Sequence, residues 1–192
     1  MNRWIIIVMT ALLLAGGAYV YSSRSANAEP LEVGAAAPDF ETTGALAGKP
    51  FKVSLSDKLK NGPVVLYFFP KAFTAGCTIE ANMFAEATAD FEAAGATVIG
   101  MSGDSMEELT KFSVEECRDK FAVARADDAV MDGYQVRMEP TLALTNRTSY
   151  VIDQNSKIAF VHSAQDPKAH VTGTLEKVKQ LARAKIAAPP ES

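Results

Sequence analysis

The stretch VVLYFFPKAFTAGC, residues 64–77, decides how the rest of this sequence is organised. Its first six residues are apolar and mostly β-branched or aromatic, which is typical of a strand buried on both faces of a sheet. Pro70 cannot donate a hydrogen bond to a neighbouring strand, so we expect the strand to end there. The stretch therefore predicts a central core strand, with Cys77 a short turn beyond it.

A helix is predicted directly after this turn. Apolar residues recur at every fourth position, at Ile79, Met83, Ala87 and Phe91, and this spacing places them on one face of a helix. Gly95 follows, and glycine is common just past the C-terminal end of a helix. Cys77 is therefore expected in the first turn of a helix that follows a core strand.

The position of Cys77 bears on the reactivity of its thiol. The thiolate is the nucleophile, and an ordinary cysteine, with a pKa of ~8.5, is only about 3% thiolate at pH 7. Ionising most of it takes roughly 3 kcal/mol, whereas a helix N-terminus supplies roughly 0.3–1 kcal/mol. A reactive Cys77 therefore requires an arginine that the fold brings back to this turn. Without one, the residue would be a small buried hydrophobe.

Three segments together resemble the peroxiredoxins. PKAFTAGC (70–77) is similar to the active-site motif of that family, GAAAPDF (34–40) to its N-terminal signature, and RTSYVID (147–153) to its arginine-led strand. The Pro-Lys opening and the Gly-Cys-Thr step are most similar to the bacterioferritin-comigratory, or peroxiredoxin Q, group. Many members of that group have a second cysteine five positions after the first, where this sequence has Asn82.

The resemblance implies roles for the residues of the active-site motif. Cys77 would be the peroxidatic nucleophile, which attacks the O–O bond of a peroxide and becomes a sulfenic acid. The hydroxyl of Thr74 would align the peroxide and donate to the thiolate, although threonine is also a good helix cap. Pro70 would shield the thiolate from water, although ending a strand explains a proline here equally well.

Arg147 is the expected cation. It precedes a predicted core strand, from which its side chain could reach Cys77 and stabilise the thiolate and the polarised peroxide together. Arg125 and Arg137 are rivals, but the Arg-x-x-aromatic-Val-Ile-Asp context favours Arg147. Glu80 would oppose ionisation of a nearby thiol. The resembling group often has a glutamate at this position, which implies that Glu80 orients Arg147 or relays a proton.

Cys117 is the only other cysteine, and three roles compete for it. It could resolve the sulfenic acid of Cys77 through an intramolecular disulfide, a task that some peroxiredoxin Q members give to the helix predicted here. It could be an inert core thiol. It could also form a permanent disulfide with Cys77, which an exported compartment permits but which conflicts with a free nucleophile. We favour the resolving role, followed by a one-cysteine mechanism.

Residues 1–28 have the pattern of a secretory signal peptide. Arg3 gives a positive start, residues 4–21 are almost wholly apolar, and Ala26-Asn27-Ala28 fits a small-x-small cleavage site. The apolar run is also close to the ~20 residues that span a membrane, so an uncleaved anchor is the alternative. Either way we expect the protein to be exported, most simply to the bacterial periplasm.

Residues 29–192 are sufficient for one domain with its own core. Strands are expected at 97–102, 121–124, 149–153 and 157–162, with helices at 105–120, 127–134 and 168–187 and a hairpin or loop within 40–59. Val171, Leu175, Val178 and Leu181 would form the buried face of the last helix. Strands that alternate with helices predict an α/β domain. This order fits a thioredoxin-like fold, with a central mixed sheet flanked by helices.

The predicted activity is reduction of hydrogen peroxide and organic hydroperoxides. A thioredoxin-like protein would be the reductant, and the protein would be a monomer or weak dimer. His162 and His170 lack metal-ligand spacing, there is no glycine-rich nucleotide loop, and a net charge of −4 gives no indication of nucleic-acid binding; no cofactor is expected. The alternatives are a thiol–disulfide exchange protein, which the lack of Cys-x-x-Cys disfavours, or a non-catalytic binding module.

Overall fold

The computed structural model describes residues 29–187. The predicted signal peptide, residues 1–28, lies outside the described residues. So does Pro189-Pro190, which we expect to end the last helix. Both therefore remain predictions. Within residues 29–187, no helix is both long enough and apolar enough to cross a membrane.

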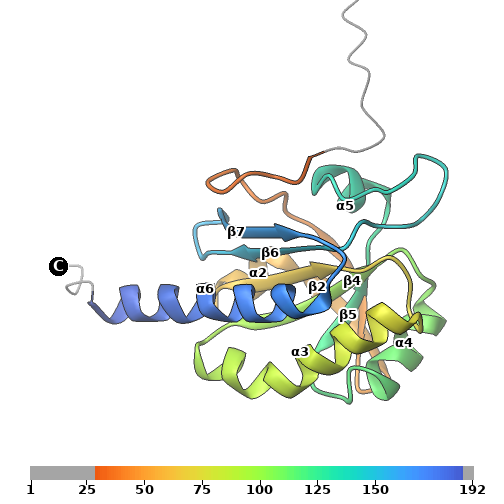
Figure 1. The fold of residues 1–192 in the computed structure, drawn as a ribbon, viewed down its shortest axis with the longest axis horizontal. Coiled ribbons are helices and arrows are strands. Elements are labelled where there is room, and N and C mark those ends of the chain that lie inside the picture. The colour runs from red at the N-terminus through yellow and green to blue at the C-terminus, as the bar shows by residue number, and fades with distance from the viewer. Residues whose placement is uncertain (1–28, 188–192) are drawn as a thin grey trace, which may run out of the picture.

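Seven strands form one mixed sheet (Figure 1), in the order β2-β1-β5-β4-β3-β6-β7. The central strands β3, β4 and β5 are parallel to one another, and the antiparallel hairpins β1/β2 and β6/β7 extend the sheet on either side. The strands are Glu41–Leu46 (β1), Lys49–Ser54 (β2), Val64–Phe68 (β3), Thr97–Ser102 (β4), Ala122–Arg125 (β5), Thr148–Ile152 (β6) and Ile158–Ser163 (β7).

Helices cover both faces of this sheet. One face packs against α3, α4 and α6, and the other packs against the shorter α2 and α5. In Figure 1, α6 lies beside α3, while α5 lies on the opposite side of the sheet. The helices are Leu55–Leu59 (α2), Ala75–Ala93 (α3), Met106–Glu115 (α4), Asp128–Gly133 (α5) and Pro167–Ala187 (α6).

The central strand β3 is buried on both faces, as predicted. Val64, Leu66 and Phe68 belong to the core cluster beneath α2 and α5, whereas Val65 and Tyr67 belong to the cluster beneath α3, α4 and α6. All five side chains are inaccessible to solvent. Because β3 also pairs with a strand on each side, neither its backbone nor its side chains meet water.

The helix predicted over 105–120 ends earlier than expected. Ser105 caps α4 in a capping box with Glu108, but the helix ends at Glu115. Arg118 and Asp119 both have left-handed backbones, with φ of +51° and +57°, and such a conformation cannot continue a right-handed helix. Cys117 therefore lies in the turn after α4, and its predicted place on the helix is wrong.

The region between residues 40 and 59 is more ordered than predicted. It forms the β1/β2 hairpin and the short helix α2, which we did not expect. Ser54 caps α2, because its hydroxyl accepts a hydrogen bond from the N–H of Asp57 at 3.3 Å. Leu55 and Leu59 pack from this helix into the core, and this tertiary contact sustains a helix too short to be stable alone.

Candidate active site

Cys77 lies in the first turn of α3, as predicted. Thr74 is the N-cap residue, and its carbonyl accepts the first helical hydrogen bond, from Thr78 N–H at 2.9 Å. The Cys77 side chain is only 1% exposed. It therefore combines the positive end of a helix with shelter from water, a setting that favours an anion only if a further donor is present.

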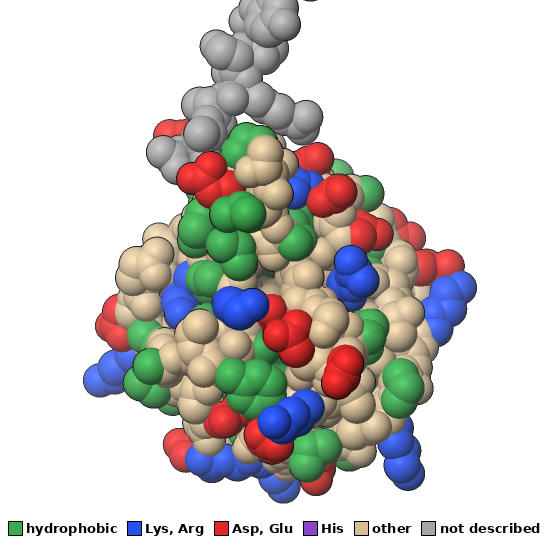
Figure 2. Space-filling view, turned by 90° about the vertical axis from the view of Figure 1, so that its right-hand side faces the viewer, with side chains coloured by type: hydrophobic (Ala, Val, Ile, Leu, Met, Phe, Trp, Pro, Cys, Tyr) green, Lys and Arg blue, Asp and Glu red, His purple; other side chains and the backbone are tan. Residues whose placement is uncertain are grey.

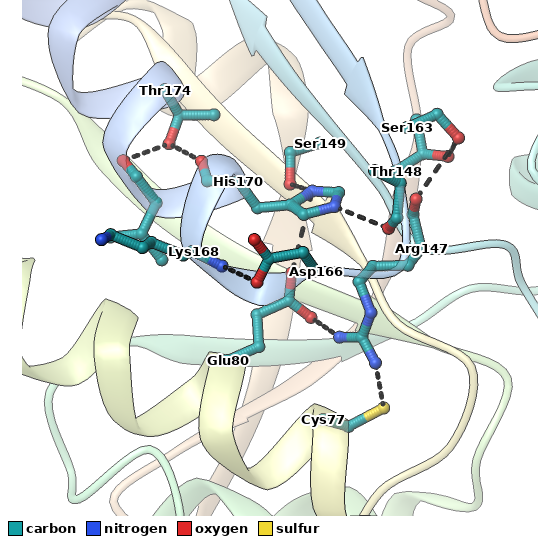
Figure 3. A network of polar contacts seen from close by, with 12 residues as sticks. Cys77, Glu80, Arg147, Thr148, Ser149, Ser163, Asp166, Lys168, His170 and Thr174 are labelled. Carbon is teal, nitrogen blue, oxygen red and sulfur yellow. Dashed lines mark hydrogen bonds and ion pairs between the residues drawn. The ribbon is translucent and has the colours of Figure 1, made fainter.

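Arg147 supplies that donor. It immediately precedes β6, whose first residue pairs with Phe68 at the end of β3, so the register brings it to the end of the sheet where α3 begins. Its Nη2 donates to Cys77 Sγ at 3.4 Å, and its Nη1 donates to the carboxyl group of the buried Glu80 (Figure 3). One guanidinium, itself 5% exposed, thus binds both a sulfur and a carboxyl group.

The two rival arginines lie elsewhere. Arg137 is paired with Asp128 and Asp132 of α5, at 2.8 and 2.7 Å. Arg125 is exposed at the end of β5. The arginine expected from the sequence is therefore the one whose guanidinium contacts the sulfur.

Thr74 and Pro70 lie beside the site. The Thr74 hydroxyl donates to the carbonyl of Lys71 at 2.9 Å and makes no side-chain capping bond. Among its described contacts it bonds neither to Cys77 nor to the helix N–H groups. The expected orientation of the hydroxyl, towards the sulfur of Cys77, is therefore not found in this structure. Pro70 is half-buried. It follows the last backbone bond of the strand, from Phe69 N–H to Met101 at 3.0 Å.

Asp104 fixes the loop between β3 and α3, and sequence reasoning missed it. One of its carboxylate oxygens accepts from the backbone N–H of Ala72 at 2.7 Å and from the Ser102 hydroxyl at 2.6 Å, while Lys71 lies 3.7 Å from the other oxygen. The carboxylate is buried. In the sequence, Gly103-Asp104 simply follows the strand predicted at 97–102, but an acidic residue at the end of a strand can also reach the loop of the neighbouring strand.

Glu80 is fully buried one turn beyond Cys77. Burial raises its pKa from 4.5 to about 8, although the charge and hydrogen bond of Arg147 oppose this shift. One carboxyl oxygen accepts from Arg147, whereas Oε1 has no hydrogen-bond partner among the described residues. The orientation of Arg147 by Glu80, which the resemblance implies, therefore agrees with this geometry.

His170 of α6 was considered only as a metal ligand and was otherwise missed. It is fully buried, and its Nδ1 lies 3.8 Å from the unpartnered Oε1 of Glu80. Burial lowers the pKa of His170 to about 4. The sequence does contain one sign of a buried role for His170: it is a polar residue next to Val171, on the apolar face of a predicted helix. In residues 29–187, no group of three or more His, Cys, Asp or Glu side chains is arranged to hold a metal ion.

Cys117 is buried in the same core cluster as Cys77. Both cysteines are free, so the permanent disulfide considered above is absent here. Burial raises the pKa of the Cys117 thiol well above its ordinary value.

Figure 2 views the end of the molecule where α3 begins. The surface there mixes charged with apolar side chains, and no histidine is visible on it.

The model of the AhpC/TSA family matches residues 33–161. The chain belongs to this family of peroxiredoxins. It is similar to a chloroplastic peroxiredoxin Q of Sedum lineare, with 35% identity over 135 residues that cover 70% of this chain and 71% of the relative. A chloroplastic peroxiredoxin Q of Arabidopsis thaliana is 37% identical over 147 residues, covering 76% and 66%.

Solved structures agree with this assignment. The peroxiredoxin is similar to peroxidoxin BcpB from Mycobacterium tuberculosis, with 30% identity and a TM-score of 0.71, over 79% of this chain and 98% of that one. The predicted thioredoxin-like fold and the predicted resemblance to the peroxiredoxin Q group are thereby confirmed.

Asn82 occupies the position at which many members of this group have a second cysteine. In this peroxiredoxin its side-chain amide donates to the carbonyl of Thr78 at 2.8 Å and to the carboxylate of Glu116 at 2.9 Å. Glu116 directly precedes Cys117. Asn82 therefore ties α3, which carries Cys77, to the turn that carries Cys117.

Proposed function

We propose that this peroxiredoxin reduces hydrogen peroxide and organic hydroperoxides with Cys77 as the nucleophile. The observation that carries the proposal is the 3.4 Å contact between Arg147 Nη2 and Cys77 Sγ, two buried groups that meet at a helix N-terminus. Charge-assisted donors that are fixed in a pocket of low polarity stabilise developing charge much more than they would in water. Membership of the peroxiredoxin family supports the same reaction.

In the first step the Cys77 thiolate attacks one oxygen of the peroxide. An S–O bond forms as the O–O bond breaks, and the leaving oxygen takes up one proton to become water or an alcohol. Sulfur is oxidised to a sulfenic acid while the peroxide is reduced. The guanidinium of Arg147 is close enough to stabilise both the thiolate and the negative charge on the departing oxygen.

In the second step the thiol of Cys117 would attack the sulfur of the Cys77 sulfenic acid, forming a disulfide and releasing water. Both sulfurs are buried, so their segments must open locally before they can join. Left-handed backbone angles at Phe73, Arg118 and Asp119 support this proposal, because each costs about 1–2 kcal/mol for a residue with a side chain. These residues flank the two segments that would open.

The cycle closes when a protein dithiol reduces the disulfide by exchange. We propose a thioredoxin-like reductant, in keeping with the family. The sequence of residues 1–28 supports an exported location. A periplasmic site, the uncleaved alternative and a monomeric or weakly dimeric state remain predictions, as does the shielding role of Pro70.

Substitution of each cysteine tests the proposal. Cys77→Ser should abolish peroxide consumption by the reduced protein, measured by stopped flow. Cys117→Ser is the matched control: it should still consume one equivalent in a single burst but should not turn over with a dithiol protein reductant. Peroxide consumption by Cys77→Ser would exclude the mechanism. Normal turnover by Cys117→Ser would exclude the resolving role and favour a one-cysteine cycle.

A further inference from the structure

A buried chain of polar groups connects helix α6 with the sulfur of Cys77 (Figure 3). It runs from His170 to Glu80, then to Arg147 and finally to Cys77. Each of these four side chains is at most 5% exposed. The reaction described above uses Cys77 and Arg147, and it gives His170 no task.

The hydrogen bonds of His170 fix the tautomer of the neutral ring. Nε2 lies 2.9 Å from the carbonyl oxygen of Ala164, which can only accept, so Nε2 carries the hydrogen. Nδ1 then presents a lone pair and accepts from the hydroxyl of Ser149 at 2.8 Å. The ring edge that faces Glu80 is therefore an acceptor.

Glu80 also directs a hydrogen-bond acceptor, its Oε1, towards Nδ1 of His170. Its Oε2 accepts from Arg147, while Oε1 has no hydrogen-bond partner within residues 29–187 and lies 3.8 Å from His170 Nδ1. A carboxylate oxygen and an unprotonated ring nitrogen are both electron-rich, so they repel one another when they face each other in a buried site. One proton on either group removes this repulsion and leaves the pair with no net charge.

We propose that His170 is a positioning residue of the peroxidatic site, which with Glu80 holds one proton and so leaves the positive charge of Arg147 available to Cys77. This inference rests on the proposed function. If the pair lost its proton, the Glu80 carboxylate would compete with the thiolate and the departing oxygen for the same guanidinium. His170 therefore acts through Glu80 and Arg147, without touching the substrate.

Several other groups face this pair. The titratable and polar groups on the elements packed around Glu80 and His170 are Tyr67 on β3, Arg147 and Ser149 at β6, His162 on β7 and Asp166 before α6. The His162 ring is 4.6 Å from that of His170, centre to centre, and it opposes a charge on His170. Burial raises the pKa of Glu80 to about 8 and lowers that of His170 to about 4. At neutral pH the shared proton therefore lies on Glu80.

Nitrogen-15 NMR of the histidine rings tests the proton directly, in the unmodified protein and without peroxide. His170 should be the Nε2–H tautomer at neutral pH, and its Nδ1 signal should shift with a midpoint near that of Glu80. Glu80→Gln should abolish this step. An Nδ1–H tautomer, or a Nδ1 signal that shifts equally in Glu80→Gln, overturns the proposal. Because no peroxide is used, this result does not depend on whether Cys77 is the nucleophile.

Single-turnover kinetics test the consequence. The rate constant for peroxide reduction should fall as the pH rises through that midpoint in the wild type. His170→Asn places an amide donor opposite Oε1, which favours the ionised carboxylate, so the decline should move about one pH unit lower. This would reduce the rate about fivefold near pH 8 and hardly at all near pH 6. The matched control is His162→Asn, which should not change the pH at which the rate constant falls.

A double variant separates positioning from mere packing. In the Glu80→Gln background, His170→Asn should no longer change the shape of the pH profile. A loss of equal size at every pH, with or without Glu80, would overturn the proposal and indicate a structural role. A wild type that does not react with peroxide at all would instead refute the proposed function, and the NMR result would still decide whether the pair holds a proton.

Discussion

At the scale of single residues, the contact between Arg147 and Cys77 depends on the lack of a side chain at Gly76. A Cβ atom built there would lie 3.0 Å from Arg147 Nη2, closer than carbon and nitrogen atoms normally approach. Gly76 belongs to the first turn of α3, where alanine would be favourable for the helix itself. The glycine therefore leaves space for the guanidinium of Arg147 and brings no advantage to the helix.

Gly76→Ala should separate activity from stability. Alanine is better than glycine in a helix by up to about 1 kcal/mol, so the midpoint of thermal unfolding should not fall. The displaced guanidinium should lower kcat/KM for peroxide about tenfold or more, because small misplacements of a catalytic group are costly. The exposed neighbour gives the control, since Ala75→Gly should reduce stability but not activity. Undiminished activity in Gly76→Ala would contradict the steric argument.

At the scale of elements, α4 is joined to the active-site loop and to α3. The Phe112 ring of α4 stacks against Phe69 and meets Phe73 edge-on, and the Phe112 carbonyl accepts from the N–H of Cys117 at 3.1 Å. The bond from Asn82 to Glu116 holds the following turn against α3. These contacts keep the turn that contains Cys117 closed.

Asn82→Ala should therefore speed disulfide formation. A hydrogen bond to a charged group is worth about 1.5 kcal/mol, which would raise the population of the open turn by about tenfold. Rapid acid quenching after one equivalent of peroxide, followed by mass spectrometry, would follow the linked cysteines. Glu116→Gln keeps an oxygen acceptor but removes the charge, so its effect should be smaller. A rate unaffected by either change would mean that opening of this turn does not limit the step.

At the scale of the whole molecule, the buried pair of Glu80 and His170 links folding to pH. The pKa of Glu80 rises from 4.5 to about 8, and that of His170 falls from 6.5 to about 4, both chiefly through burial. Between pH 4.5 and 6.5 the folded pair holds one proton on Glu80, and the unfolded pair holds one on His170. The pair therefore makes stability neither rise nor fall with pH in that range.

Above pH 6.5 the unfolded chain loses this proton, while the folded protein keeps it up to pH about 8. The folded state then binds more protons, so the free energy of unfolding should fall by about 2 kcal/mol over this range. Glu80→Gln retains only the contribution of His170, which is constant above pH 6.5. Urea unfolding at several pH values should therefore show the fall in the wild type alone. Equal falls in both proteins would assign it to other groups.

Much of the fold could be predicted because its signals are local. The double-sided burial of β3 follows from six consecutive apolar residues, and the face of α6 follows from Val171 and Val178 at helical spacing, both of which are buried. The end of α4 could not be predicted in this way. The pattern of apolar residues does not predict the left-handed backbone at Arg118 and Asp119, because that conformation depends on how the turn packs.

The sequence by itself determined the family, the strand-then-helix frame of Cys77 and the choice of Arg147, because each is encoded in a short run of neighbouring residues. Only the tertiary structure decided which groups surround that pair. The partnerships of Glu80 with His170 and of Asp104 with the active-site loop join residues far apart in the chain. They exist because burial excludes water, so each polar group must find its partner among the side chains that folding brings within reach.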